Sequence, residues 1–226
     1  MQLKTILTLG RIAARVLYRF EAHGIENIHA SGPCILGCNH PGKLLGDMFV
    51  MLAIMPRRIP VVIAPEGMAR GQAGRIGVMR SRGERLSARL FSAGLRSLPS
   101  IGISRGGDSP AAQNLAMMKA LDGGEAVFLA VEGEVEWDGL LNPPRSGAPW
   151  MALRTGAPFV PIGVTGSYDI WPRWEQNPHL TGKVIVRIGQ PIRLVETPPE
   201  WIDDRMIEDA GQRIMTEIGK LVGVAR

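Results

Sequence analysis

His40 and Asp47 are the pair of residues whose types and spacing suit acid–base chemistry. They lie in the stretch NHPGKLLGD, residues 39–47. Proline disfavours helical geometry in the residue before it, so we expect His40 in an extended loop, and Gly42 permits a sharp turn before a helix begins. That turn would let Asp47 reach one ring nitrogen and leave the other to take a proton. The alternative interpretation is a structural histidine with a carboxylate nearby by chance.

No serine or cysteine accompanies this pair in the strand-to-helix setting of a nucleophile. A histidine base here would therefore act directly on the hydroxyl of a substrate.

Polar residues follow four of the strands that the sequence predicts. His40 follows one strand and Glu132 another, and Arg105 and Thr165-Gly166 follow two more. In open α/β sheets, ligands bind beyond the carboxyl ends of the strands. We therefore expect these four strand ends to form one site.

Apolar segments typical of strands alternate with segments typical of helices. The predicted strands are 32–40, 58–66, 100–107, 125–134, 157–166 and 182–192, and the predicted helices are 69–97, 109–124, 146–156 and 198–223. This alternation predicts an α/β fold with a mostly parallel central sheet and helices on both faces.

The N-terminal segment has apolar residues at helical spacing and a basic polar face, which predicts an amphipathic helix over 1–20 followed by a single domain over 21–226. The helix would pack on the domain or lie in a membrane interface. No apolar run has the length of about 18–20 residues that a spanning helix needs, and arginines interrupt the segment where a signal peptide would be apolar. We expect a cytoplasmic protein, peripheral to the inner face of the cell membrane.

The positive charge of the chain is concentrated in residues 57–105, which hold ten arginines, no lysine and two acids. Such a stretch suits an anionic membrane surface, a nucleotide-bearing cofactor or nucleic acid, or is a solvated basic helix. Phe91 is its single aromatic residue, which argues against nucleic acid. Cys34 and Cys38 would lie too far apart on one strand for a disulfide, and we predict that both are core thiols.

Four stretches of the sequence resemble, in order, the motifs of one family. HGIENIHASGPCILGCNHPG leads into His40, SIGISRGG carries Arg105, AVFLAVEGE holds Glu132, and RSGAPWMALRTGAPFVPIGVTG centres on Pro161. With VRIGQPI, their order and spacing agree with those of the family over roughly residues 20–195. Over this range the sequence resembles the PlsC-like lysophosphatidic acid acyltransferases, a family of glycerolipid acyltransferases.

The resemblance implies transfer of a fatty acyl group from acyl-CoA or acyl carrier protein to a hydroxyl of a lysolipid or glycerol phosphate. His40 would be the general base and Asp47 its orienting acid, with direct attack on the thioester and no metal or resident cofactor. Arg105 would hold the phosphate of the acceptor. The residues implied to contact the substrates are Asn39, Lys43, Gly102, Ser104, Arg105, Glu132, Gly133 and Pro161.

The sequence departs from the family pattern at two points. Six residues separate His40 from Asp47, more than is usual in the family. After the third motif, Glu134, Glu136 and Asp138 replace a threonine and a basic residue. These acids would suit a zwitterionic or cationic headgroup, such as that of an aminoacyl or choline-type lysolipid, or they face solvent.

Two other functions remain open. A hydrolase on the same scaffold would use water in place of the acceptor alcohol. A non-catalytic lipid- or phosphate-binding protein would use the basic stretch 57–105. The stretch WPRW, residues 171–174, suits either an aromatic anchor in a membrane interface or packing within the domain.

Overall fold

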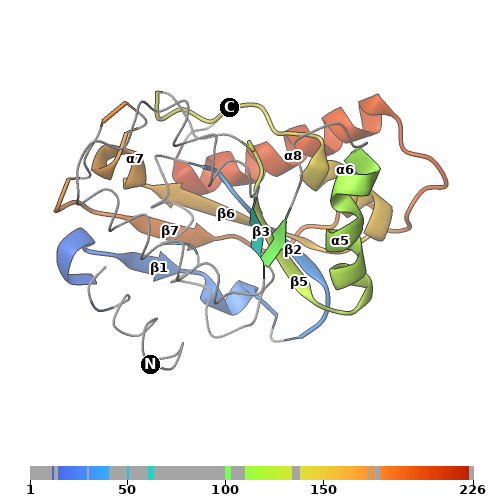
Figure 1. The fold of residues 1–226 in the computed structure, drawn as a ribbon, viewed down its shortest axis with the longest axis horizontal. Coiled ribbons are helices and arrows are strands. Elements are labelled where there is room, and N and C mark those ends of the chain that lie inside the picture. Colours follow the sequence, from blue (N-terminus) through green and yellow to red (C-terminus); the bar gives the residue numbers. More distant parts are fainter. Residues whose placement is uncertain are drawn as a thin grey trace.

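The structure, a computed structural model, describes residues 12, 15–29, 31–40, 50, 61–63, 100–102, 110–133, 138–172, 174–175 and 179–223. In this part of the chain, one sheet of seven strands has the order β1-β7-β6-β2-β5-β3-β4 (Figure 1). The strands are β1 (Glu21–His23), β2 (Cys34–Cys38), β3 (Val61–Ile63), β4 (Ser100–Gly102), β5 (Ala126–Ala130), β6 (Phe159–Thr165) and β7 (Ile185–Ile188). The helices are the 3₁₀ turn η1 (Ile25–Asn27), α5 (Pro110–Asp122), α6 (Gly147–Thr155), α7 (Ser167–Ile170) and α8 (Asp204–Val222).

Five neighbouring strands, from β6 across the sheet to β4, run parallel to one another. Each of them falls within a predicted strand, and α5, α6 and α8 fall within predicted helices. The predicted α/β fold with a mostly parallel sheet is therefore confirmed.

The two strands at the other end of the sheet run in the opposite direction. β7 is antiparallel to β6, and β1 is parallel to β7. Neither this reversal nor β1 was predicted. After β6 the chain returns through the short helix α7 and a loop, which suffices because antiparallel neighbours need no crossover helix. As a result, Glu21 at the start of β1 pairs with Ile185, which in turn pairs with Thr165 at the end of β6.

Helices α5, α6 and α8 cover one face of the sheet, where Phe159, Met151 and Ile214 are fully buried. Helix α8 begins where the Asp203 carboxylate accepts a hydrogen bond from the N–H of Met206 at 2.8 Å. It ends at Gly223, whose φ of 82° stops the helix. These caps define the two ends of α8, which packs along β6, one of the strands whose carboxyl ends border the site.

The opposite face buries a second cluster that includes Phe128, Ile162 and Val186. Phe20, Ile170 of α7 and the helical residue Val50 pack against it. Helical residues therefore lie on both faces of the sheet. The predicted basic helix over 69–97 lies outside the described residues.

Residues 15–18 are helical and belong to the predicted N-terminal helix. Tyr18 packs on the core, and this burial raises the pKa of its phenol. Val16 and Leu17 remain 74% and 44% exposed. The helix is thus anchored at its end while part of its apolar face stays in contact with solvent. No helix of the described part of the chain is long and apolar enough to cross a membrane. The division into an N-terminal helix over 1–20 and a domain over 21–226 stays a prediction.

Strand β2 is buried along its whole length, and the prediction that Cys34 and Cys38 are core residues is confirmed. Gly37 lies between them and has no room for a side chain. A Cβ atom there would lie 2.2 Å from Cζ of Phe159 and 2.8 Å from Cγ2 of Val131. The Phe159 ring therefore packs directly on the backbone of β2.

We expect Gly37→Ala to lower the free energy of unfolding by about 1–3 kcal/mol, because the added methyl group overpacks this contact. Adding Phe159→Leu should recover part of the loss, since the smaller side chain leaves room and neighbouring sites couple. Urea denaturation of the single and double variants measures both effects. Equal stability of wild type and Gly37→Ala would contradict the packing.

Candidate active site

Three strand ends meet at the carboxyl edge of the parallel part of the sheet, here called the catalytic edge. β2 lies between β5 and β6, and Cys38 is paired with Ala130 on one side and Ile162 on the other. The residues that follow β2 and β5 are Asn39-His40 and Val131-Glu132. The expected convergence of His40, Glu132 and Thr165 at one edge is therefore present.

Glu132 holds the backbone of His40. Its side chain is 2% exposed, and its carboxylate accepts hydrogen bonds from the N–H of His40 at 2.7 Å and from the N–H of Asn142 at 2.6 Å. Hydrogen bonds to an ionised acceptor are stronger than neutral ones. The carboxylate thus joins the loop after β2 to the loop that precedes α6. It fixes the position of the His40 backbone from which the imidazole projects.

Asn39 holds the same loop from the other side. Its amide donates to the C=O of Val164 at 3.1 Å and accepts from the N–H of Val164 at 2.8 Å. A side-chain amide that donates to and accepts from one residue reproduces the pairing of a strand backbone, so it extends the contact between β2 and β6 beyond Cys38. At 3% exposed, Asn39 has a positioning role in this structure, and its contact with substrate stays a prediction.

Arg145 is a residue of this edge that the sequence analysis missed. Gly133 has a φ of 67°, and a Cβ there would lie 2.8 Å from Cγ of Arg145, so the arginine side chain crosses the backbone of the glycine. The N–H of Arg145 also donates to the C=O of Val131 at 2.9 Å. An exposed guanidinium group thus lies beside the Glu132-Gly133 turn. Its signal in the sequence was its place as the first residue of the fourth motif, RSGAPWMALRTGAPFVPIGVTG, 12 residues beyond Gly133.

The other predicted site residues are placed less fully. Gly102 is the last residue of β4, whose carboxyl end lies at the same edge. Pro161 lies inside β6 opposite Gly37, three residues before the level of Val164, so the structure does not bring it to the strand ends. Asp47, Lys43, Ser104 and Arg105 lie outside the described residues. Among the residues described, no cluster of His, Cys, Asp and Glu could hold a metal ion.

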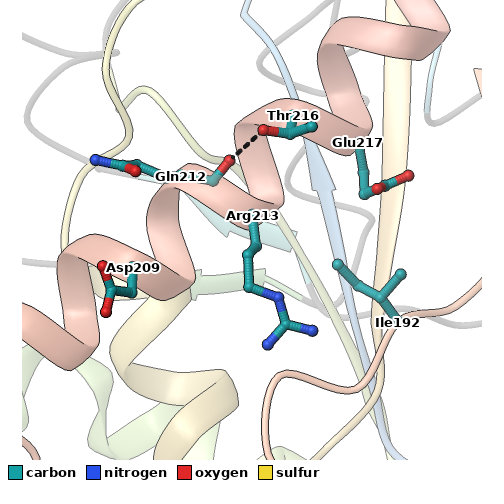
Figure 2. A pocket seen from close by; sticks show the side chains of 6 residues that line it. All are labelled: Ile192, Asp209, Gln212, Arg213, Thr216 and Glu217. Carbon is teal, nitrogen blue, oxygen red and sulfur yellow. Dashed lines mark hydrogen bonds between the residues drawn. The ribbon is translucent and has the colours of Figure 1, made fainter.

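A surface hollow of about 540 Å³ lies on α8, away from the catalytic edge. Its residue Ile192 bridges to Phe159, the first residue of β6, which places the hollow at the amino end of the parallel strands. Figure 2 shows its lining side chains, which are Ile192, Asp209, Gln212, Arg213, Thr216 and Glu217. The guanidinium of Arg213 donates to the C=O groups of Arg193 and Leu194, both at 3.1 Å, so this arginine ties α8 to the loop after β7.

A family model described as Acyltransferase matches residues 19–165, which include β2, β5, β6 and the His40–Glu132 contact. The chain belongs to the acyltransferase family. The resemblance noted from the four motifs is thereby confirmed.

Relatives of this acyltransferase chain include 1-acyl-sn-glycerol-3-phosphate acyltransferase alpha of Mus musculus, 23% identical over 197 residues, which are 86% of this chain and 63% of that protein. The chloroplastic 1-acyl-sn-glycerol-3-phosphate acyltransferase BAT2 of Brassica napus is 26% identical over 185 residues, or 77% of this chain and 45% of that protein. The chain therefore spans less than two thirds of the length of these curated relatives.

The acyltransferase chain also resembles a solved structure. The crystal structure of the 1-acyl-sn-glycerophosphate (LPA) acyltransferase PlsC from Thermotoga maritima matches it with a TM-score of 0.65. The match covers 97% of this chain and 79% of that chain at 18% sequence identity. At this identity, the likeness shows a shared fold.

We expect Asn39→Asp to destabilise the acyltransferase by about 2–5 kcal/mol at neutral pH, because a buried carboxylate would replace the donor that faces the C=O of Val164. Burial raises the pKa of the introduced carboxyl above its unfolded value of about 3.9. The neutral form can donate to Val164, so the destabilisation should shrink as the pH falls through the raised pKa. Thermal unfolding across pH measures this, and a destabilisation that does not change with pH would contradict the assigned hydrogen bonds.

We expect Glu132→Ala to lower the free energy of unfolding by about 2–4 kcal/mol, since each donor left without its acceptor costs about 1–3 kcal/mol. Glu132→Gln should cost less, because one amide oxygen can still accept. The exposed residue Glu125 offers a matched control, and Glu125→Ala should stay within about 0.5 kcal/mol of wild type. Guanidinium denaturation compares the three variants, and equal losses in Glu132→Ala and Glu125→Ala would contradict the role given to Glu132.

Proposed function

We propose that this chain transfers a fatty acyl group from acyl-CoA or acyl carrier protein to a hydroxyl of a lysophospholipid or related lysolipid, as a step of phospholipid biosynthesis. The observation that carries the proposal is the fixed position of His40. The loop that bears it is held to β5 by Glu132 and to β6 by Asn39, at the edge where ligands of such sheets bind. Membership of the acyltransferase family and the printed names of the relatives support the same reaction.

In the proposed reaction His40 takes the proton of the acceptor hydroxyl while its oxygen attacks the thioester carbonyl carbon. The tetrahedral intermediate then collapses, the carbon–sulfur bond breaks, and the imidazolium returns its proton to the leaving thiolate. The Nδ1 atom of His40 is buried, so Nε2 is the nitrogen assigned to the substrate. The carboxylate of Glu132 accepts from the backbone N–H of His40 at 2.7 Å and so holds the backbone from which the imidazole projects.

The remaining roles come from the family resemblance. Asp47 would orient the imidazole, Arg105 with Gly102 and Ser104 would hold the phosphate of the acceptor, and Lys43 would attract the phosphate or thioester. Glu132 and Gly133 shape the acceptor site by placing His40 and the side chain of Arg145. The acceptor headgroup is zwitterionic or cationic in this proposal, because three acids follow Gly133 in the sequence.

The enzyme would work as a peripheral protein on the cytoplasmic face of a membrane. The basic stretch 57–105 and the N-terminal helix would contact anionic headgroups. The exposed side chains of Val16, Leu17 and Arg15 support such a contact for the helix. No resident metal or cofactor is part of the proposal, and the acyl donor is a co-substrate.

His40→Ala should reduce single-turnover acyl transfer from labelled palmitoyl-CoA to lysolipids by about 10²- to 10⁴-fold, the usual contribution of general acid–base catalysis. The exposed residue His29 offers a matched control, and His29→Ala should retain wild-type turnover. A panel of lysolipids identifies the preferred headgroup. Acylation of lysophosphatidic acid alone would contradict the proposal that the acceptor headgroup is zwitterionic or cationic.

Two results of the same assay would contradict the proposal. Release of free fatty acid at full rate without a lysolipid would indicate a hydrolase. Equal turnover by wild type and His40→Ala would remove His40 from the chemistry.

A further inference from the structure

Three large apolar side chains protrude from loops at the catalytic edge and are here called the apolar loop patch. They are Leu140, Trp174 and Leu180, which are 60%, 58% and 75% exposed. Burying apolar surface is favourable in proportion to its area, so side chains of this size that stay in water on a folded domain call for an explanation.

The loops that carry the patch are packed against one another. The ring of Trp174 meets the ring of Tyr168 edge-on at a centroid distance of 5.4 Å, and a Cβ on Gly139, next to Leu140, would lie 3.2 Å from the Tyr168 ring. On the other side, the N–H of His179 donates to the C=O of Ile170 in α7 at 2.7 Å, which places Leu180 beside the end of this helix. The three side chains are thus presented by one assembled set of loops around α7.

This set of loops borders the proposed base. Leu140 is two residues before Asn142, whose N–H donates to the Glu132 carboxylate that holds His40. Helix α7 directly follows Thr165-Gly166 at the end of β6. The patch and the proposed base therefore lie at the same edge of the sheet.

The N-terminal helix reaches the same edge. Because β1 runs against β6, Glu21 lies in one row with Ile185 and Thr165, and the ion pair between Glu21 and Lys183 at 2.9 Å joins the start of β1 to the loop after Leu180. The ammonium of Lys183, with His23, lowers the pKa of Glu21. Figure 1 shows the helical turn before β1 and helix α7 on the same side of the molecule, at the left of the view.

Exposed apolar side chains are distributed unevenly over the described residues. Of the nine large ones, Leu140, Trp174 and Leu180 form the patch, and Ile12, Val16 and Leu17 belong to the N-terminal helix that leads into β1 from the same edge. Trp201, 74% exposed, precedes α8 at the opposite edge. Two acids beside the patch have partners, because Asp138 accepts from the N–H of Leu140 at 3.0 Å and Glu175 lies 2.9 Å from the imidazole of His179. The patch itself is apolar, and the exposed Arg15 and Arg19 lie on the helical side.

We infer that the apolar loop patch is a membrane-docking surface, which inserts Leu140, Trp174 and Leu180 into the interface of a lipid bilayer. Tryptophan and leucine are the residues that interfacial segments bury at this depth. We assign a lipid bilayer to this surface because the proposed acceptor is itself a lipid. With the catalytic edge on the membrane, His40 would face the lipid layer from which the acceptor enters the site. The inference rests on the proposed function for that acceptor.

Flotation of the full chain with phosphatidylcholine vesicles, with and without phosphatidylglycerol, tests this surface. We expect Trp174→Ala with Leu180→Ser to weaken partitioning at least about tenfold, as the loss of buried apolar area predicts. Leu140→Ser alone should act in the same direction, and the matched control Trp201→Ala should bind as wild type. The loss should persist at high salt, because apolar insertion is not screened.

Unchanged partitioning of the patch variants, or an equal loss in Trp201→Ala, would overturn the inference. The inference would also be overturned if the patch variants bound vesicles fully but lost turnover only with acyl carrier protein substrates. That result would assign the patch to a protein partner. Turnover of a short-chain acceptor dissolved as monomers tests the proposed function separately. We expect wild type and the patch variants to be equal there, and absence of wild-type turnover would count against the acyl transfer while flotation still decides the surface.

Discussion

The arrangement at the catalytic edge depends on a buried carboxylate that accepts two backbone N–H groups. An ionised side chain is costly to bury unless it is hydrogen-bonded, and the N–H groups of His40 and Asn142 meet that requirement for Glu132. Both donors come from loops, which have no regular ladder of their own. The carboxylate and the loops therefore stabilise each other, and each has a defined position only while the other is present.

Asn39 anchors the same loop on the other side of β2. The strand ends at Cys38, yet the amide of Asn39 continues to pair with Val164 of β6. Two adjacent residues, Asn39 and His40, are thus tied to the two neighbouring strands, one through its side chain and one through its backbone. This division leaves the imidazole of His40 as the group of the pair that is available for chemistry.

The sequence predicted those parts of the fold that local patterns determine. The apolar strands β2, β5 and β6 and the helices α5, α6 and α8 each have enough residues to show their period or their boundaries. β1 has three residues and is held by its pairing with β7, so no local pattern marks it. The reversed direction of β7 was missed because an apolar run of residues has the same pattern whichever direction the strand takes.

For the site too, the sequence predicted what local patterns determine and missed what depends on contacts between distant residues. Motif order identified His40 and Glu132 as members of one site, because both follow strands. Their hydrogen bond joins residues 92 apart in the sequence, and only the register of β2 against β5 brings them together. Arg145 escaped notice for a related reason, since its place over Gly133 depends on the path of the loop between them.

The long sequence separation of these contacts has a consequence for how the protein matures. The loop of His40 is tied to partners 92 and 125 residues further along the chain. Contacts of such separation form late, after the cost of closing the long intervening loops has been met. During synthesis the N-terminal part emerges first, so a nascent chain carries its histidine long before Val164 exists to anchor it. The arrangement around His40 would thus form near the end of folding, once β5 and β6 have docked on β2.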